Sequence, residues 1–444
     1  MKPKATVHQA QRELFRTELE GLVDAGHALV KMGRQMNWAS FDEQLGQTYD
    51  PSTGAPGVST RLMVALHYLK YRYDLSDDVV LAQWVENPYW QHFSGMQFFE
   101  HEMPIHPSSM TRWRKRLGEA GAEAMLKATI DTGLKMKVIT PAQIERVNVD
   151  TTVQTKAVRF PTDARLYDRA RERLVKTARK QGLSIKQSYE RVGRRLLMAQ
   201  SRYAHARQMK RARACTRKLR TNLGRVIREI ERQQSQPQGL LGKLLETAKR
   251  IHAQERGDGQ KVYSVHEPEV ACIAKGKAGK KYEFGNKVSL AATSKGGWLL
   301  GALSLLGNPY DGHTLDAQLT QVRRLVTGHA VKEGHVDMGY RGNNHQGPET
   351  IIVDKRRRGT IPKRVWKWMK RRAAIEPTIG HLKAEHRLER NRLKGTQGNA
   401  INALLSAAAM NFQKLLGFFL CRLLHFLRSL FVPASLDQFL AVIS

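Results

Sequence analysis

The chain has 444 residues, enough to bury several hydrophobic cores, and its length suggests two to four domains. Lysine and arginine total 74 against 40 aspartate and glutamate, so the formal net charge is +34 at neutral pH, with the excess spread along the chain. Such a chain binds polyanions by releasing their counterions, which makes nucleic acid the expected partner. A hydrophobic content of 41% excludes a disordered tail protein.

Cysteine use and hydropathy indicate a cytoplasmic protein. Three cysteines lie far apart, without metal-ligand spacing: Cys215, Cys272 and Cys421. This spacing argues against a disulfide scaffold or zinc site and for a reducing compartment. The N-terminus lacks the apolar core of a signal peptide. Residues 415–432 are the only membrane candidate, but basic side chains interrupt them every three residues, so we expect a packing helix and no membrane partner.

The first third of the chain is predicted to be helical. Residues 1 to about 40 form a helical lead-in of weak specificity, and from Arg61 apolar residues recur at helical spacing. Ser76 offers an N-cap, with Asp77 and Asp78 in the first turn of a second helix that runs through Trp84. A third helix is expected to start at residues 107–109.

The third helix has an apolar face and a basic face. Met110, Trp113 and Leu117 share one side. The opposite side carries three cations: Arg112, Lys115 and Arg116. A helix docked in a DNA groove needs this arrangement, but an ordinary solvated surface explains it equally well.

After a helix to about Lys137, residues 145–153 alternate like a β-strand. Asn148, Asp150 and Thr152 lie on one side and the valines on the other. An acid in a valine-rich strand is costly when buried alone, so Asp150 is expected to be exposed, paired or bound to a metal.

Residues 163–256 differ from the rest of the chain, being rich in arginine, lysine, alanine, glutamine and leucine. We interpret them as a helical insertion with a basic exterior, broken at Gly182 and Gly193 and by a loop at 235–239. The insertion could clamp DNA, mediate dimerisation, or both.

Short strands with glycine-rich turns are predicted from Tyr263 to about residue 306, followed by a turn at 308–313. Asp311 and His313 could pair on a metal, but a turn-forming aspartate is the commoner explanation, so they rank below the other candidates.

A helix is expected at residues 316–327, and the next strand ends at Asp337, followed by Gly339. In an α/β sheet, the carboxyl end of a strand is where ligands usually bind. Residues 349–354 predict a further strand.

Residues 371–395 are predicted to be helical. At about 100° per residue, Arg372, Glu376, Lys383 and Arg387 fall in one narrow sector, so a single carboxylate lies within a cationic stripe. Such a stripe suits a metal held beside nucleic acid phosphates, although i,i+4 ion pairs on an exposed helix give the same pattern. Pro377 indicates that the helix starts or kinks beside Glu376.

The spacing of these residues resembles a known signature. Arg372, Glu376 and Lys383 are similar to the Tyr-Arg-Glu-Lys signature of bacterial insertion-sequence transposases, with Met369 in place of the tyrosine. Trp366 or Trp368 could take over the role of that tyrosine. The segments VDTT, VDMGYRG and RNRLKG look like the insertion-sequence-five (IS-five) family in particular, whose helical DNA-binding domain also has PSSMTRWR-like segments.

The resemblance implies an α/β ribonuclease-H-like catalytic domain with an N-terminal all-helical DNA-binding domain and a helical insertion. The helical DNA-binding domain would span residues 1–135, and the catalytic domain residues 136–162 and 257–410. The insertion would span residues 163–256. An amphipathic helical tail would span residues 411–444.

The resemblance also implies a reaction and its residues. Asp150, Asp337 and Glu376 would be the catalytic carboxylates and would hold Mg²⁺, with Mn²⁺ as a possible substitute. Arg372 and Lys383 would bind phosphates near the scissile bond, and the basic face of the third helix (Arg112, Lys115 and Arg116) would bind DNA.

The partners would be double-stranded DNA, as terminal inverted repeats and target, and further copies of the chain, in a homodimer or a higher synaptic complex. A non-transposing metal-dependent nuclease of the same fold, or an inactive or architectural DNA-binding protein, remains the alternative.

Overall fold

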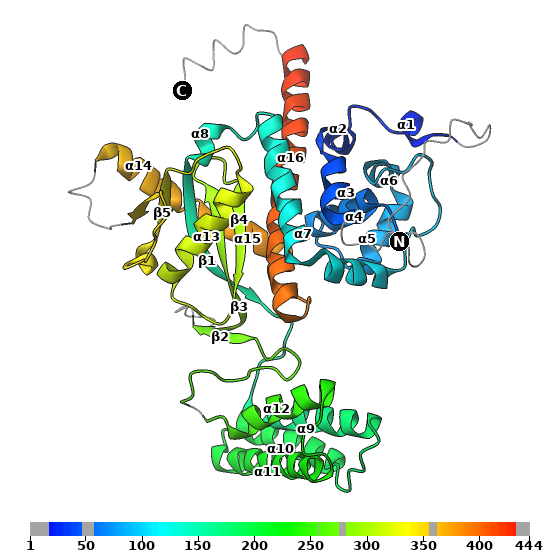
Figure 1. Cartoon of the computed structure of the whole chain (residues 1–444), viewed down its shortest axis with the longest axis vertical. Helices are drawn as coiled ribbons and strands as arrows, with labels where there is room; N and C mark the ends of the chain where they lie inside the picture. The colour runs from blue at the N-terminus through cyan, green and yellow to red at the C-terminus, as the bar shows by residue number, and fades with distance from the viewer. Residues whose placement is uncertain (1–16, 47–56, 256, 275–280, 355–361, 432–444) are drawn as a thin grey trace.

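The computed structural model describes residues 17–46, 57–255, 257–274, 281–354 and 362–431. The chain is a mixed α/β protein in which N-terminal helices and a mixed sheet flank a long C-terminal helix, while four helices form a separate lobe (Figure 1). The basic segment 355–359 lies outside the described residues.

Seven helices make up the described N-terminal region up to Lys135. They are α1 (Leu19–Leu22), α2 (Ala28–Gln35), α3 (Trp38–Gly46), α4 (Thr60–Arg72), α5 (Asp77–Glu86), α6 (Pro88–Phe93) and α7 (Pro107–Lys135). The predicted cap of α5 is confirmed, because the Ser76 side chain accepts a hydrogen bond of 3.2 Å from the Val79 amide. The start predicted for α7 is also confirmed, although its cap is the His106 side chain.

The two faces expected of α7 are present. Met110, Trp113 and Leu117 are buried, whereas Arg112, Lys115 and Arg116 are exposed. The helix kinks at Gly118, whose positive φ of 66° suits a residue without a side chain.

The sheet is mixed, with the order β2-β3-β1-β5-β6 and β4 paired with β3. Its strands are β1 (Arg146–Thr155), β2 (Ala271–Ala274), β3 (Tyr282–Thr293), β4 (Leu299–Leu305), β5 (Glu333–Val336) and β6 (Thr350–Val353). Strand β1 is central, antiparallel to β3 on one side and parallel to β5 on the other, while β5 and β6 are parallel. The hairpin predicted at Gly296-Gly297 joins β3 to β4, and both glycines have positive φ.

The helices around the sheet are α8 (Pro141–Ile144), α13 (Asp311–Leu325), the 3₁₀ turn η1 (Met338–Tyr340), α14 (Lys363–Arg372), α15 (Ile375–Glu385) and α16 (Gly395–Phe431). Helix α13 begins at Asp311, five residues earlier than expected. The helix predicted around Glu376 is wrong as a single element, because α14 ends at Arg372 and α15 starts at Ile375.

Helix α16 lies alongside α7 at the centre of the molecule (Figure 1). Its stretch Gly395–Leu420 is long and apolar enough to cross a membrane, but 67% of its most apolar window is buried within the protein. This part of the helix therefore belongs to the hydrophobic core. One hydrophobic cluster joins it to the N-terminal helices and to the sheet.

The helical insertion forms the lobe at the bottom of Figure 1, with α9 (Asp163–Lys180), α10 (Glu190–His205), α11 (Met209–Gln233) and α12 (Gly239–Ala253). It has a hydrophobic cluster of its own. The break expected at Gly182 is confirmed, but the one at Gly193 is wrong. Gly193 is buried inside α10, where an added Cβ would lie 2.4 Å from Asp168 Oδ1 of α9. The close packing of α10 against α9 therefore explains why a residue without a side chain occupies position 193.

Candidate active site

Three aspartates lie at the same edge of the parallel part of the sheet: Asp337 and Asp354 directly follow β5 and β6, and Asp150 lies within β1, just beyond its parallel pairing with β5. Asn148 of β1 pairs with His335 of β5, and two residues further on Asp150 and Asp337 reach the same level. Asp354 directly follows β6, and its amide donates to the Val336 carbonyl oxygen at 2.8 Å. Parallel pairing thus gathers residues more than 180 positions apart in the sequence.

Asp150 is held in an unusual electrostatic environment. Burial, followed by the neighbouring Asp337 carboxylate, raises its pKa to about 6. The Thr151 amide donates a hydrogen bond of 2.7 Å to Asp150 Oδ1, and Arg372 opposes the rise. Perturbed carboxylates of this kind cluster at functional sites.

Asp311 joins this group from the first turn of α13. Its Oδ1 accepts from Thr151 Oγ1 at 2.9 Å and from Lys287 Nζ at 2.9 Å, and its charge also raises the Asp150 pKa. A Cβ added at Gly339 would lie 3.0 Å from Asp337 Oδ1 and 3.4 Å from Asp311 Oδ2. Both carboxylates therefore border the same small space beside η1.

Arg372 stands among the acids. Its guanidinium lies 3.7 Å from Asp150, 3.6 Å from Asp354 and 3.6 Å from Glu376. Asn148 fixes the end of α14 beside β1, because its side-chain amide donates 3.0 Å to the Arg371 carbonyl oxygen. The i,i+4 ion pair expected between Arg372 and Glu376 therefore exists across the junction of the two helices.

Glu376 does not reach the two aspartates. Its side chain is 66% exposed and faces Arg372. Within the described part of the chain, no three Asp, Glu, His or Cys side chains form a ready set of metal ligands. The structure thus brings Asp150 and Asp337 together and leaves Glu376 across Arg372 from them.

The remaining predicted residues occupy two places. Lys383 lies half-buried on α15, whereas Arg112, Lys115 and Arg116 belong to α7 in the helical region. The prediction that Arg387 lies on the same helical face as Glu376 is wrong, because α15 ends at Glu385. Arg387 instead forms an ion pair of 2.8 Å with Asp74, which lies just after α4.

The residue at the signature's tyrosine position is buried. Met369 is 5% exposed on α14 and therefore serves the packing of that helix. The Trp368 ring lies between two guanidinium groups, 4.9 Å from that of Arg146 and 5.3 Å from that of Arg371.

Two acids of this cluster escaped sequence reasoning. The sequence predicts Asp354 as the last residue of a strand and favours a turn-forming role for Asp311. The available signal was the position of Asp354 directly after a predicted parallel strand, where ligands usually bind.

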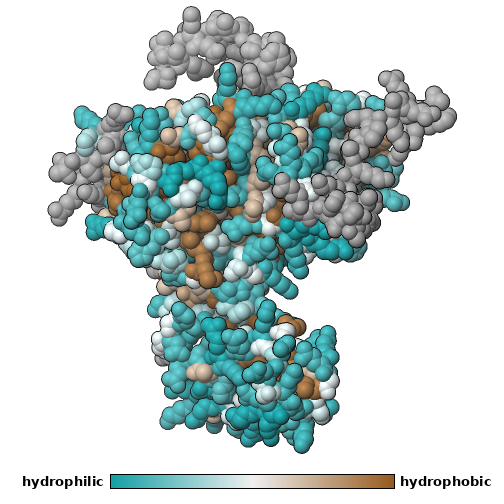
Figure 2. All heavy atoms as spheres, viewed as in Figure 1, coloured by the Kyte–Doolittle hydropathy of each residue, from teal (hydrophilic) through white to brown (hydrophobic). Residues whose placement is uncertain are grey.

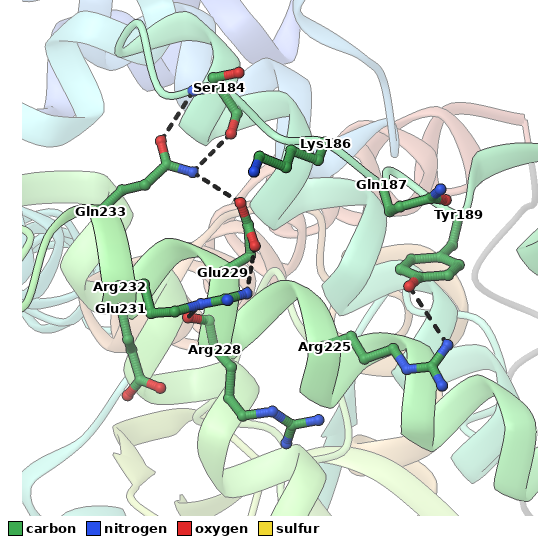
Figure 3. A pocket seen from close by; sticks show the side chains of 10 residues that line it. All are labelled: Ser184, Lys186, Gln187, Tyr189, Arg225, Arg228, Glu229, Glu231, Arg232 and Gln233. Carbon is green, nitrogen blue, oxygen red and sulfur yellow. Dashed lines mark hydrogen bonds and ion pairs between the residues drawn. The ribbon is translucent and has the colours of Figure 1, made fainter.

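A hollow in the insertion lies away from these acids, between the segment 184–189 and α11 (Figure 3). It measures about 990 Å³ and is lined by Lys186, Arg225, Arg228 and Arg232 beside two glutamates. Glu229 is engaged by Arg232 and Gln233, so the surplus charge of the wall is positive.

Comparison with known proteins identifies the chain. Residues 17–116 match a family described as "Transposase domain (DUF772)", and residues 347–416 match one described as "Transposase DDE domain". The chain is a DDE transposase. The second match contains Arg372, Glu376 and Lys383, and the first contains the basic face of α7.

The transposase also has a curated relative. It is 50% identical to the "Uncharacterized protein ORF8 in nfe locus" of Rhizobium meliloti over 198 residues, which make up 45% of this chain and 95% of that protein. The two belong to one family. No solved structure matches the transposase.

The aspartate pair fits a divalent cation. Asp150 and Asp337 offer hard oxygen donors, and a cation between them would relieve the repulsion that raises the Asp150 pKa. Glu376 would become a third carboxylate ligand only if its side chain exchanged Arg372 for the cation.

Proposed function

We propose that this transposase belongs to the IS-five group, binds the terminal inverted repeats of its own element, and cleaves and joins DNA at a ribonuclease-H-like site built on β1, β5 and α15. The proposal rests on the adjacency of Asp150, within β1, and Asp337, directly after the parallel strand β5, with Arg372 and Glu376 beside them. Helical residues 1–135 would recognise the repeats, and residues 136–162 and 257–410 would carry the chemistry.

Asp150 and Asp337 would hold Mg²⁺, or Mn²⁺ in its place, with Glu376 as the third carboxylate. When bound, the metal supplies a lower pKa for the attacking water or 3′-hydroxyl and neutralises the leaving oxygen. Arg372 lies 12% exposed among these acids, where its guanidinium can turn from carboxylate to phosphate. Lys383 would bind a flanking phosphate.

Two features of the chain favour this proposal over a purely architectural protein. A protein that only bound DNA would gain nothing from acids at its cationic surface, because carboxylates repel phosphates. The acids here are gathered at one sheet edge and one of them is partly desolvated. Synapsis of two ends would need a second copy of the chain, and the reaction would take place in the cytoplasm on nucleoid DNA.

The test uses the purified full chain and a labelled duplex carrying candidate element ends from the DNA that flanks its gene. Cleavage and strand transfer are measured with Mg²⁺ or Mn²⁺ and with a chelator. We expect end-specific cleavage and joined products that need the metal. Asp337→Ala should abolish both products while the protein still binds the same duplex, since the acid opposes DNA binding.

The alternatives give different results in the same assay. Cleavage without joined products would indicate a non-transposing nuclease. Binding without cleavage, over a range of ends and both metals, would indicate an inactive copy or an architectural protein. An Asp337→Ala variant as active as the wild type would contradict the assignment of the site.

A further inference from the structure

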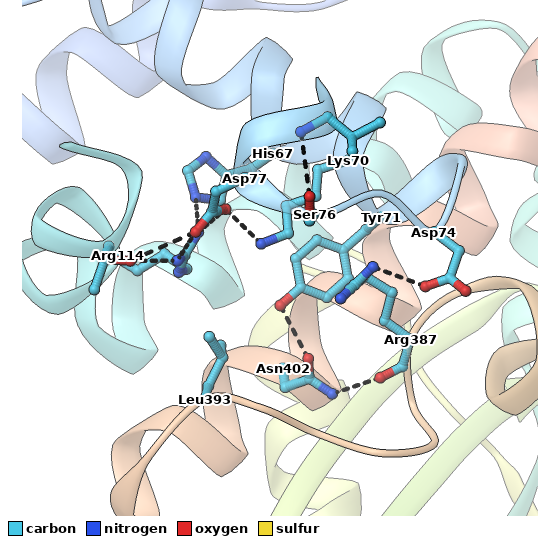
Figure 4. Close-up of polar contacts among 12 residues, drawn as sticks. His67, Lys70, Tyr71, Asp74, Ser76, Asp77, Arg114, Arg387, Leu393 and Asn402 are labelled. Atoms are coloured by element: carbon cyan, nitrogen blue, oxygen red, sulfur yellow. Dashed lines mark hydrogen bonds and ion pairs between the residues drawn. The ribbon is translucent and has the colours of Figure 1, made fainter. Parts of the chain in front are cut away.

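A strongly cationic cleft of about 500 Å³ lies between the N-terminal helices and the segment that follows α15 (Figure 4). Two carboxylates line it, Asp77 and Asp78. The cations that line it are Lys70, Arg114, Lys115, Arg387, Arg390, Arg392 and Lys394. Its charge is therefore far from balanced.

The floor of the cleft holds a surplus positive charge. Asp77 accepts from Arg114 at 2.8 and 2.6 Å and from Lys70 at 2.5 Å, so two cations share one carboxylate. The Lys70 and Arg114 side chains are 6% and 5% exposed, which leaves little water to offset the second charge. Burial and the nearby Arg114 accordingly lower the pKa of Lys70 to about 8. An anion at the mouth of the cleft would offset this charge.

The wall of the cleft opposite Lys115 is the segment RNRLKG, residues 390–395. Arg390, Arg392 and Lys394 are exposed, and no carboxylate of the described residues forms an ion pair with any of them or with Lys115. Exposed cations without acidic neighbours are available to phosphates.

This segment is hydrogen-bonded to the end of β1. Arg387 and Arg390 have positive φ angles of 64° and 56°, which non-glycine residues rarely adopt. The Arg390 amide donates to Thr155 Oγ1 at 3.1 Å, and the Asn391 amide donates to the Thr155 carbonyl oxygen at 2.8 Å. The end of β1 therefore holds the strained conformation in place.

Buried amide groups connect the cleft to the strand that carries Asp150. The Tyr71 hydroxyl of α4 donates to Asn402 of α16 at 3.0 Å, and Asn402 donates to Gln154 of β1 at 2.7 Å (Figure 4 shows the first contact). Asn402 also donates 2.9 Å to the Arg387 carbonyl oxygen. A ligand in the cleft is thereby fixed relative to the acids.

We propose that this cleft binds the phosphate backbone of the transposon end, with Arg390, Arg392 and Lys394 on one wall and Lys115 on the other, and so sets the position of the duplex relative to Asp150. The proposal rests on the proposed function for the identity of the DNA. The strong positive charge of the cleft, its buried surplus cation and its hydrogen-bonded link to β1 together favour a fixed polyanion over a freely exchanging counterion.

The test compares Arg392→Ala/Lys394→Ala with the wild type by fluorescence anisotropy of a labelled end duplex at several salt concentrations, without divalent metal. Each lost phosphate contact lowers the slope of log K against log salt by about 0.9, so we expect a slope smaller by about two and a weaker affinity. Because no metal is present, binding is measured whether or not the chain cleaves DNA.

Two controls make the result specific. Lys135→Ala/Lys137→Ala removes two exposed lysines at and just beyond the C-terminal end of α7, whereas Lys115 lies near its N-terminal end, and should keep the wild-type slope. Arg392→Lys/Lys394→Arg should also keep the slope, because it preserves the charges. An unchanged slope in the alanine variant would overturn the proposal. So would an equal loss in either control, which would point to net charge or to folding.

Discussion

At the scale of single residues, Asp311 shows how the fold adds a carboxylate that sequence motifs did not rank highly. It lies in the first turn of α13, where the helix dipole favours negative charge, and it binds both Lys287 and Thr151. Thr151 neighbours Asp150 in β1, so Asp311 contacts the strand of the proposed metal site through a side chain next to the acid. For that proposed site, Asp311 would be a positioning residue.

We predict that Asp311→Asn slows cleavage by about 10- to 100-fold, the range found when partners of metal ligands are altered. The amide keeps the size of the side chain but removes the charge that pairs with Lys287. The rate is measured in single turnover with saturating DNA. Asp316→Asn, one turn further along α13 and 44% exposed, is the matched control. Equal rates in wild type and Asp311→Asn would contradict the positioning role.

The scale of elements shows what could be predicted from the sequence. Periodicity predicted α4, α5, α7 and β1 with small errors at their ends, because their apolar faces repeat within a few residues. It could not predict that Asp354 and Asp150 both lie near Arg372, because parallel pairing across β5 depends on contacts distant in sequence. The start or kink that Pro377 indicates beside Glu376 is confirmed, because α15 starts at Ile375, but the helix propensity of Ala373 and Ala374 gave no sign of where α14 ends.

The packing of α4 against α7 predicts a pH dependence of stability. His67 of α4 is fully buried, donates from Nδ1 to the Met63 carbonyl oxygen at 2.7 Å, and meets Arg114 of α7 at 3.4 Å through Nε2. Burial, then the charge of Arg114, lowers its pKa to about 3. The unfolded chain therefore protonates His67 at a higher pH than the folded chain does. As the pH falls from about 6.5 towards 3, the free energy of unfolding decreases.

At pH 4 this loss amounts to about 3 kcal/mol, from about 1.4 kcal/mol per pKa unit. This loss of stability is measured around α4 by the hydrogen exchange of its amides at pH 7 and pH 4, after correction for the intrinsic exchange rate at each pH. His67→Gln cannot take up the proton, so its protection should change less between the two pH values. The same change in the variant and the wild type would show that other groups cause the acid sensitivity.

At the scale of the whole molecule, the excess positive charge that runs along the chain is densest in the helical lobe, which carries none of the acids of the candidate site. Residues 163–253 hold 25 lysines and arginines against seven acids, more than half of the excess of the chain. Their hydrophobic cluster is separate from the one that joins the sheet to α16, and the surface of the lobe is mostly hydrophilic, with a few apolar patches, in the view of Figure 2. A basic lobe with its own core suits a second contact with DNA.

Helix α10 provides the sharpest test of this role. Arg191, Arg195 and Arg202 are exposed, lie within about 40° of one another on the helix, and form no ion pair with a described carboxylate. If the lobe clamps DNA, replacing all three by alanine lowers the salt slope of duplex binding by two to three, at about 0.9 per contact. The lysine triple variant keeps the charges and should keep the slope. A clamp needs a duplex long enough to reach from the cleft to the lobe, so the effect should vanish on a short duplex that the cleft alone can hold. A normal slope on long DNA, together with weaker self-association in sedimentation, would instead assign the lobe to dimerisation.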